Sequence, residues 1–260
     1  MSRIQKLFDL TGKSALVTGA TGAFGEAVAK ALAEAGAHVT IAGGNAEALN
    51  ELAGSLKASG ALVETIALRP SDATCCDQIV AVAADDGRGL DILVSASGSA
   101  IVKPILDMDD RDWDSVMDAN AKQSWMLCRS AGRVFADQGR GGAVVLVSSV
   151  RSKFATAAGT SVYGASKAAV DMITRSLATE WGAMDVRVNA IAPTVFRSAL
   201  TAWLYEDDAA EKRADVLKRI PLGRLAEPDD FAGSVVFLAS KASGLITGHV
   251  LNVDGGFSAN

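Results

Sequence analysis

Thr18-Gly19-Ala20-Thr21-Gly22-Ala23-Phe24-Gly25 joins a short β-branched run, which ends at Thr18, to an alanine-rich stretch with helical character. Small residues in such a strand-to-helix turn let the backbone approach a ligand closely. The first turn of the helix adds free N–H groups and the positive end of the helix dipole, which together bind phosphate. The stretch therefore predicts the pyrophosphate turn of a dinucleotide-binding fold, with the expected cofactor contacts Gly19, Thr21, Gly22, Ala23, Phe24 and Gly25.

Short β-branched runs recur on both sides of this turn, with helical stretches such as Glu26–Ala35 and Ala46–Ala58 between them. Each run is continuously apolar rather than alternating, as in strands that are covered on both faces. The spacers are long enough for crossover helices, and no linker or internal repeat interrupts the chain. We therefore expect one domain over residues 1–260: a doubly wound Rossmann fold with helices on both faces of a seven-stranded parallel sheet, with strands Ala15–Thr18, His38–Ala42, Val63–Ala67, Ile92–Ser95, Val144–Ser148, Val186–Ile191 and Val250–Val253.

The composition excludes several classes of function. With 49% hydrophobic and 21% charged residues the chain of 260 residues is typical of a folded globular protein. The formal charge is -5, and no cluster of Lys and Arg is suited to binding nucleic acid. Three cysteines (Cys75, Cys76 and Cys128) and two histidines argue against a structural metal site and a disulfide framework. The absence of a long apolar run predicts a soluble, cytoplasmic protein without a membrane partner.

The least regular segment lies between Pro193 and Pro228, where only Ala209–Arg219 has a helical pattern and no strand signal occurs. Ligands of open α/β sheets bind outside the carboxyl ends of the strands. A segment that leaves the sixth strand is therefore well placed to cover a ligand, and we expect a substrate lid at residues 194–226. The alternative is a surface helical hairpin.

A tyrosine and a lysine lie four residues apart in Tyr163-Gly164-Ala165-Ser166-Lys167 and meet on one face of a helix. A tyrosine is a poor base at neutral pH because its ordinary pKa is about 10, and a neighbouring cation lowers that pKa by stabilising the phenolate. A tyrosine and a lysine at this spacing are common on helices, so the pair alone does not indicate a catalytic function. Two serines, Ser148 and Ser149, follow an apolar strand upstream of this pair.

These motifs together resemble the short-chain dehydrogenase/reductase family, whose single-domain members carry Thr-Gly-x-x-x-Gly-x-Gly. This chain has Ala23 at the middle glycine and Gly22 one position early. The spacing of Gly19, Gly22 and Gly25 instead matches the two-domain branch of epimerases and dehydratases. The length favours the single-domain branch, since no residues remain for a separate C-terminal substrate domain, and the later motifs agree with it.

The resemblance implies an NAD(P)-dependent oxidoreductase that interconverts a secondary alcohol and a ketone by hydride transfer. Tyr163 would move the hydroxyl proton, and Lys167 would bind the nicotinamide ribose and lower the pKa of the tyrosine. Ser149 would hydrogen-bond the substrate oxygen, with Ser148 as the alternative. Asn120, expected on a helix over Trp113–Phe135, would hold a water in the proton path. Enoyl reductases of the superfamily space their Tyr and Lys more widely, which favours carbonyl/alcohol chemistry here.

The nicotinamide and its ribose are expected against Ser97, Gly98, Pro193, Val195 and Ser198 by the same resemblance. Ser95-Ala96-Ser97-Gly98 departs from the family's usual Asn-Asn-Ala-Gly. No metal site is expected.

The choice between NAD and NADP rests on the end of the second strand, where an acidic residue binds the ribose hydroxyls and a nearby Arg accommodates a 2′-phosphate. Gly43, Gly44 and Asn45 provide neither. Arg69 replaces the Asp that family members commonly place after the third strand; it can stack on adenine, reach a phosphate, or simply be solvated. Both cofactors remain open, with a lean to NADP.

Substrate identity rests on a weaker signal. The segment Ala192-Pro193-Thr194-Val195-Phe196-Arg197-Ser198 is similar to that of some sugar, polyol and sugar-acid dehydrogenases of the family. Arg151 can pair with a carboxylate, although a surface charge is the alternative. The expected walls of the substrate pocket are Ser97, Arg151, Lys153, Phe154, Thr194, Phe196, Trp203 and Tyr205.

Two other functions remain open. One is a non-catalytic dinucleotide-binding sensor, although Tyr163 and Lys167 are both present. The other is an epimerase or lyase that uses bound NAD. The family resemblance also implies a homotetramer, packed through the helices of Asn120 and Tyr163 and through the last strand, where Thr247-Gly248 and Asp254-Gly255-Gly256 match the family.

Overall fold

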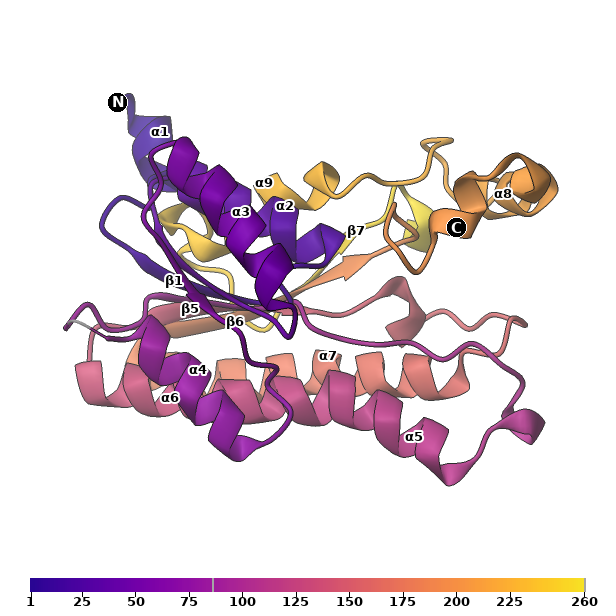
Figure 1. The fold of residues 1–260 in the computed structure, drawn as a ribbon, viewed down its shortest axis with the longest axis horizontal. Coiled ribbons are helices and arrows are strands. Elements are labelled where there is room, and N and C mark those ends of the chain that lie inside the picture. Colours follow the sequence, from indigo (N-terminus) through magenta and orange to yellow (C-terminus); the bar gives the residue numbers. More distant parts are fainter. Residues whose placement is uncertain (86, 260) are drawn as a thin grey trace.

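A computed structural model describes residues 1–85 and 87–259. Its strands form one parallel sheet in the order β3-β2-β1-β4-β5-β6-β7 (Figure 1). This confirms the predicted seven-stranded parallel sheet. The strand order reverses between β1 and β4, which places a binding crevice at the carboxyl ends of these strands. The strands are β1 Ser14–Thr18, β2 His38–Ala42, β3 Val63–Ile66, β4 Ile92–Ser95, β5 Gly142–Val147, β6 Val186–Pro193 and β7 Val250–Val253.

Helices cover both faces of the sheet, as predicted (Figure 1). One layer contains α1 Arg3–Phe8, α2 Ala23–Glu34, α3 Ala46–Ala58 and α9 Asp229–Ala239. The opposite layer contains α4 Ala73–Ala83, α5 Asp110–Met117, α6 Gln123–Gln138 and α7 Ser161–Trp181. Short 3-10 turns lie at Ile105–Asp107, Val150–Ser152, Gly182–Met184, Ala202–Tyr205, Asp207–Ala209, Lys241–Ser243 and Phe257–Ala259.

The core consists of two apolar clusters, one on each face of the sheet. Val17 and Val145 pack into the cluster under α2, α3 and α9, whereas Leu16 and Leu146 pack into the cluster under α4, α6 and α7. Successive side chains of a strand point to opposite faces, so a strand covered on both sides is apolar throughout. This arrangement explains the continuous apolar runs in the sequence.

The helix expected over Trp113–Phe135 is interrupted in the structure. It begins earlier, at Asp110, where Asp109 and Asp112 form a capping box. A π-helical turn over Asp118–Lys122 then separates α5 from α6, which runs on to Gln138. The apolar stripe continues on both sides of the turn, so the interruption left no mark in the periodicity. π turns within α-helices often lie at functional sites.

Residues 194–226 leave the carboxyl end of β6 and carry α8 Ala210–Leu217 at the far end of the molecule (Figure 1). Leu204 and Ile220 of this segment pack against Val150 and Phe257 in a third apolar cluster. Phe196 also forms a parallel bridge with Ala226, although the sequence had no strand signal there. The segment is therefore packed on the body at both ends.

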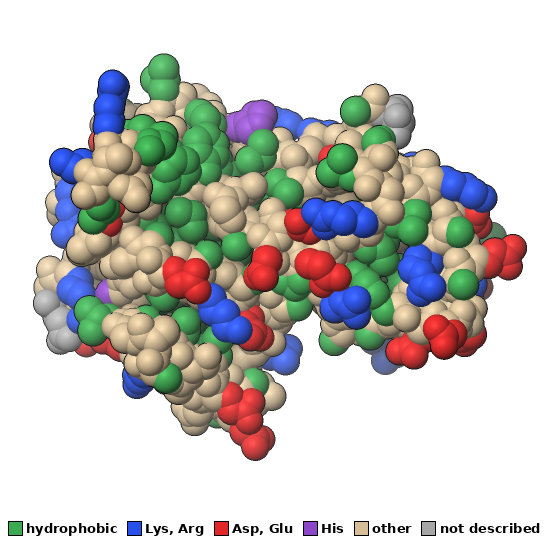
Figure 2. Space-filling model, turned by 90° about the horizontal axis from the view of Figure 1, so that it is seen from above, with side chains coloured by type: hydrophobic (Ala, Val, Ile, Leu, Met, Phe, Trp, Pro, Cys, Tyr) green, Lys and Arg blue, Asp and Glu red, His purple; other side chains and the backbone are tan. Residues whose placement is uncertain are grey.

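The surface over α2, α3 and α9 carries interspersed acidic and basic side chains (Figure 2). The lobe that carries α8 lies to the right, and a notch separates it from the rest of the outline in this view. No helix in the described part of the chain is long and apolar enough to cross a membrane.

Candidate active site

The glycine turn packs tightly against neighbouring backbone atoms. Gly19 has a φ of +68°, and a Cβ there would lie 2.7 Å from the backbone N of Ser97. A Cβ at Gly25 would overlap the carbonyl oxygen of Gly19. Gly22 faces more open space and caps α2 without any side-chain hydrogen bond, which leaves the first N–H groups of this helix available to an anion. The turn therefore fits a pyrophosphate group.

A cavity of about 300 Å³ opens beside this turn, at the carboxyl ends of β4, β5 and β6. Thr194 lines it, and its buried Oγ1 has no hydrogen-bond partner in the described part of the chain. A cavity lined by apolar walls and a few polar groups is typical of a cofactor and substrate site. The residues expected from the sequence that line it are Phe24, Ser97, Gly98, Asn120, Ser149, Arg151, Tyr163, Lys167, Pro193, Thr194, Val195, Phe196 and Ser198.

Tyr163 and Ser149 meet in this cavity. Both side chains line it, and Ser149 is near enough to lower the pKa of Tyr163; Ser149 Oγ accepts a bond of 3.1 Å from the backbone N of Arg151. Ser148 turns the other way: its hydroxyl donates to the carboxylate of Asp171. Of the two candidate serines, it is thus Ser149 that lies against the tyrosine.

Burial raises the pKa of Tyr163, while Ser149 and the charge of Arg151 lower it. The sequence pattern had assigned this lowering to Lys167. In the structure Lys167 Nζ lies 5.8 Å from the centre of the Tyr163 ring and donates a bond of 2.8 Å to the carbonyl of Val147. Both cations therefore lie near Tyr163: the charge of Arg151 lowers its pKa, and Lys167 lies over its ring.

Lys167 is buried, and burial lowers its pKa to about 8, with Asp171 opposing the shift. Because the unfolded lysine has a pKa of about 10.4, the unfolded state binds more protons between these values, so this group makes stability rise with pH. The free energy of unfolding of the wild type minus that of Lys167→Met should therefore rise by about 2 kcal/mol between about pH 7 and 10. Urea unfolding of both proteins measures this difference.

The difference between the two proteins is needed because Cys76 and Cys128 act in the opposite direction. Burial raises the pKa of each of these thiols to about 12, so their contribution to stability falls as the pH rises above the ordinary thiol value. Both proteins share that effect, which cancels in the difference. A difference that stays constant over this pH range would contradict the assignment of the low pKa to Lys167.

Asn120 lies in the π turn and is buried. Its Nδ2 donates to the carbonyl of Ser99 (2.8 Å) and to Ser166 Oγ (3.0 Å), and its Oδ1 accepts from the N–H of Ser99 (3.1 Å). Ser166 in turn donates to the carbonyl of Tyr163. The amide therefore ties the loop after β4 to the helix that carries Tyr163 and Lys167.

The end of β2 lies beside this cavity and is covered by Arg69. A Cβ on Gly44 would lie 2.8 Å from Cγ of Arg69 and would overlap its Nε, so the guanidinium side chain crosses the space that a side chain at Gly44 would fill. Arg69 is exposed and makes no ion pair or side-chain hydrogen bond in the described part of the chain. A Cβ on Gly43 would lie 3.4 Å from Oγ1 of Thr21, and Asn45 caps α3. Arg69, which follows β3 in the chain, thus places a cation at the end of β2.

Four of the expected wall residues lie elsewhere. Trp203 is 52% exposed, because the 3-10 turn Ala202–Tyr205 points Leu204 inward in its place. Tyr205 stacks under the guanidinium of Arg197 at 3.7 Å, and Phe154 packs on Phe257. Lys153 lines a different cavity. Leu200 and Thr201 of the expected lid line the cavity, and so does the alternative serine Ser148. The wall residues that sequence reasoning missed, for which no motif gave a signal, are Ala96, Ser99, Ala100, Val102, Val147, Val150 and Thr160.

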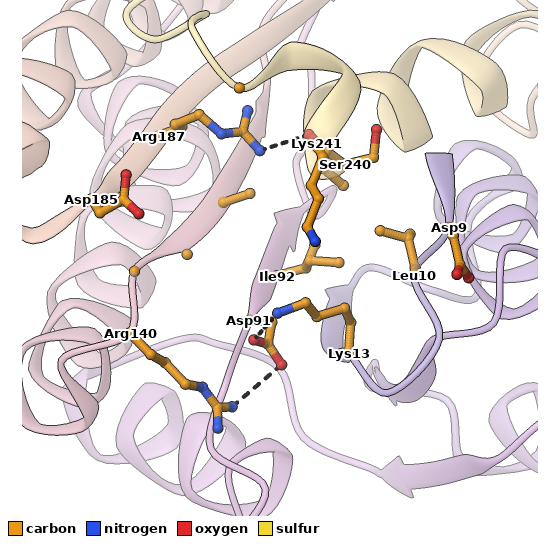
Figure 3. Close-up of a pocket in the computed structure, with 15 residues that line it drawn as sticks. Asp9, Leu10, Lys13, Asp91, Ile92, Arg140, Asp185, Arg187, Ser240 and Lys241 are labelled. Atoms are coloured by element: carbon orange, nitrogen blue, oxygen red, sulfur yellow. Dashed lines mark hydrogen bonds and ion pairs between the residues drawn. The ribbon is translucent and has the colours of Figure 1, made fainter. Parts of the chain in front are cut away.

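A further cavity, of about 250 Å³, lies at the other end of the strands, by the amino ends of β4 and β5 (Figure 3). Asp91 binds both Lys13 (2.9 Å) and Arg140 (3.3 Å) there. Arg187 donates to the carbonyls of Leu238 and Ser240. Asp91 thus links the residues that precede β1, β4 and β5, and Arg187 links β6 to the end of α9, so these charges have structural partners.

Comparisons with known proteins identify the family of this chain. Residues 19–258 match the model of the family described as enoyl-(acyl carrier protein) reductase. An uncharacterised oxidoreductase of Mycobacterium tuberculosis is 48% identical over 97% of this chain and 93% of its own. A D-threitol dehydrogenase of Mycolicibacterium smegmatis is 38% identical over 96% of this chain and 95% of its own.

A solved structure from Beutenbergia cavernae shares 37% identity with this chain at a TM-score of 0.91. It covers 98% of this chain and all of that one, and it is described as a candidate NAD(P)-dependent gluconate 5-dehydrogenase with bound NADP at low occupancy. The fold agrees with these matches. The chain therefore belongs to the short-chain dehydrogenase/reductase family of NAD(P)-dependent oxidoreductases.

Proposed function

We propose that this protein is an NAD(P)-dependent alcohol dehydrogenase or carbonyl reductase that interconverts a secondary alcohol and a ketone on a polyol or sugar-acid substrate. The observation that carries the proposal is the meeting of Ser149, Tyr163 and the buried Lys167 on the wall of one cavity. Relatives named for D-threitol and for gluconate support the substrate class.

The nicotinamide, when bound, accepts the hydride in oxidation and supplies it in reduction. Tyr163 takes the hydroxyl proton in one direction and returns it in the other. Ser149 hydrogen-bonds the reacting oxygen, and Lys167 holds the nicotinamide ribose. Asn120 completes the proton path. The cofactor is held by the turn residues Gly19, Thr21, Gly22, Ala23, Phe24 and Gly25, by Gly43, Gly44, Asn45 and Arg69, and by Ser97, Gly98, Pro193, Val195 and Ser198.

The test is a panel of polyols and sugar acids incubated with NAD⁺ and with NADP⁺. We expect reduced nicotinamide and ketone to form in equal amounts on at least one substrate. Product without net reduction of the nucleotide would favour an epimerase or lyase. Binding of the nucleotide without turnover on any alcohol or ketone would favour a sensor and would overturn the proposal.

We also propose that NADP is the preferred cofactor. The end of β2 has no carboxylate to repel a 2′-phosphate, and Arg69 crosses Gly44 with a guanidinium that has no other partner in the described part of the chain. A phosphate is a good ligand for a free guanidinium. The NADP in the B. cavernae structure supports the same choice.

Arg69→Ala should therefore weaken NADPH binding by about 10-fold or more and leave NADH binding nearly unchanged, because only NADPH carries the 2′-phosphate. Gly44→Asp should have the larger effect, since it displaces Arg69 and adds a negative charge. Fluorescence titration of each variant with both nucleotides measures the change. Equal losses for NADH and NADPH would mean that Arg69 does not recognise the 2′-phosphate.

We propose a cytoplasmic homotetramer of single-domain subunits, with residues 194–226 as the substrate lid. Leu200 and Thr201 of this segment line the cavity. Trp113, Trp125 and Met172 are each about half exposed on the helical layer that includes α5, α6 and α7, as expected for a subunit interface. Sedimentation of the purified protein tests the oligomeric state.

A further inference from the structure

Two guanidinium groups lie against one phenylalanine ring beside the active-site cavity. Cζ of Arg151 lies 5.4 Å from the centre of the Phe257 ring, and Cζ of Arg219 lies 4.6 Å from it. Arg151 belongs to the 3-10 turn that follows β5, whereas Arg219 follows α8 in the 194–226 segment. The cations come from distant parts of the sequence, and the fold brings them to a common ring.

Neither guanidinium pairs with a carboxylate in the described part of the chain. Arg151 donates only to the carbonyls of Phe154 (3.3 Å) and Ala155 (3.4 Å), and Arg219 makes no side-chain hydrogen bond. Two other arginines of the 194–226 segment, Arg197 and Arg224, each have an acidic partner. The lack of a counter-charge thus distinguishes the pair at Phe257.

The two charges are close enough to act on each other. Burial lowers the pKa of Arg151, and the charge of Arg219 lowers it further. Repulsion between like charges of this kind is relieved by an anion that binds between them. Planar guanidinium groups stacked on an aromatic face suit the two oxygens of a carboxylate.

The pair is also within reach of the reaction. Arg151 lines the active-site cavity, two residues after Ser149, and its charge lowers the pKa of Tyr163. A substrate whose anionic group is bound by Arg151 would therefore present its alcohol carbon to Tyr163. Arg219 would bind the same group from the 194–226 segment.

We propose that Arg151 and Arg219 together bind the carboxylate of the substrate, so that the enzyme acts on hydroxy acids of the sugar-acid type in preference to uncharged polyols. The proposal rests on the dehydrogenase function given above and names the substrate class of that site. Phe257 is the apolar platform on which the two cations are held.

Gluconate and glucitol test this directly, because they share a carbon chain and differ at one end, where a carboxylate replaces a hydroxymethyl group. We expect the wild type to have the higher kcat/KM on gluconate. In Arg219→Gln and in Arg151→Gln the ratio of kcat/KM on gluconate to that on glucitol should fall by about 10- to 100-fold, mainly through KM. Arg219→Lys should give an intermediate ratio because it keeps the charge and loses the planar fork.

Arg133→Gln is the matched control, because it removes a surface guanidinium of α6 that pairs with Asp77 and does not line the cavity. It should leave the ratio at the wild-type value. An unchanged ratio in both Arg151→Gln and Arg219→Gln would overturn the proposal while the dehydrogenase function stands. A wild type that prefers glucitol 6-phosphate to gluconate would also overturn it, in favour of a phosphate.

A binding measurement separates this proposal from the proposed function. Gluconate should raise the Tm of the wild type and of Arg133→Gln, and glucitol should not. The rise should be lost in Arg151→Gln and Arg219→Gln. If no alcohol is oxidised by the wild type, these shifts still support the carboxylate site while the dehydrogenase function fails; equal shifts in all four proteins would overturn the site.

Discussion

Tyr163→Phe should lower kcat by about 100- to 10,000-fold and leave the dissociation constant for NADPH within about twofold of the wild type. The variant keeps the ring, which is half-buried on α7, and removes only the hydroxyl that lies in the cavity with Ser149. Steady-state oxidation and a nucleotide titration on the same preparation measure both quantities.

The sequence offers a matched control, because the chain has only two tyrosines. Tyr205 stacks under Arg197 outside the cavity, and its hydroxyl has no hydrogen-bond partner in the described part of the chain. Tyr205→Phe should therefore keep more than about half of the wild-type activity. Near-normal turnover by Tyr163→Phe would show that another group moves the proton.

Gly25→Ala should have the second large effect, on the nucleotide site and on stability together. The added Cβ would overlap the backbone oxygen of Gly19, which cannot move aside without opening the turn. Overpacking of this kind costs about 1–3 kcal/mol, so Tm should fall by several degrees. Affinity for NADPH should fall by about 10-fold or more, since the turn holds the pyrophosphate.

Gly54→Ala is the control for this substitution. Gly54 lies in α3, and a Cβ there would meet no atom within 4 Å. Alanine has the higher helix propensity, so Tm should stay level or rise slightly. A Gly25→Ala protein with unchanged Tm and unchanged NADPH affinity would contradict the account of the turn.

The fold could be predicted from sequence because its strands are covered on both faces. Continuous apolar runs such as Ile92–Ser95 have the same bounds in the structure as in the prediction, and so does the helix Ala46–Ala58. Other ends shifted by one to three residues: β1 begins at Ser14, β3 ends at Ile66, and α2 spans Ala23–Glu34. β5 stops at Val147, which frees Ser148 and Ser149, and β6 runs on to Pro193.

The π turn around Asn120 and the direction of Lys167 could not be predicted. Hydrophobic periodicity averages over several turns, so one added residue in the turn Asp118–Lys122 leaves the pattern intact. A spacing of four residues brings Tyr163 and Lys167 to one face of α7, yet it does not reveal that Lys167 points at the Val147 carbonyl.

The residues that surround the substrate site could not all be predicted, because long-range packing places them and no local sequence pattern encodes that packing. Aromatic residues in the 194–226 segment were expected to face the pocket, but Trp203 faces solvent and Leu204 takes the inner position. Arg151 was recognised as a candidate from its place beside Ser149. Its pairing with Arg219 across Phe257 required the tertiary structure.

The central claim is that this chain binds a nicotinamide dinucleotide at the turn and cavity described above. Titration of the purified protein with NADH and with NADPH, followed by the fluorescence of its four tryptophans and of the reduced nicotinamide, tests it without knowledge of the substrate. We expect saturable binding of both, tighter for NADPH, and a large loss in Gly25→Ala. If neither nucleotide binds to the wild type, the departures at Ala23, Arg69 and Ser95 mark a lost cofactor site, and the account is wrong.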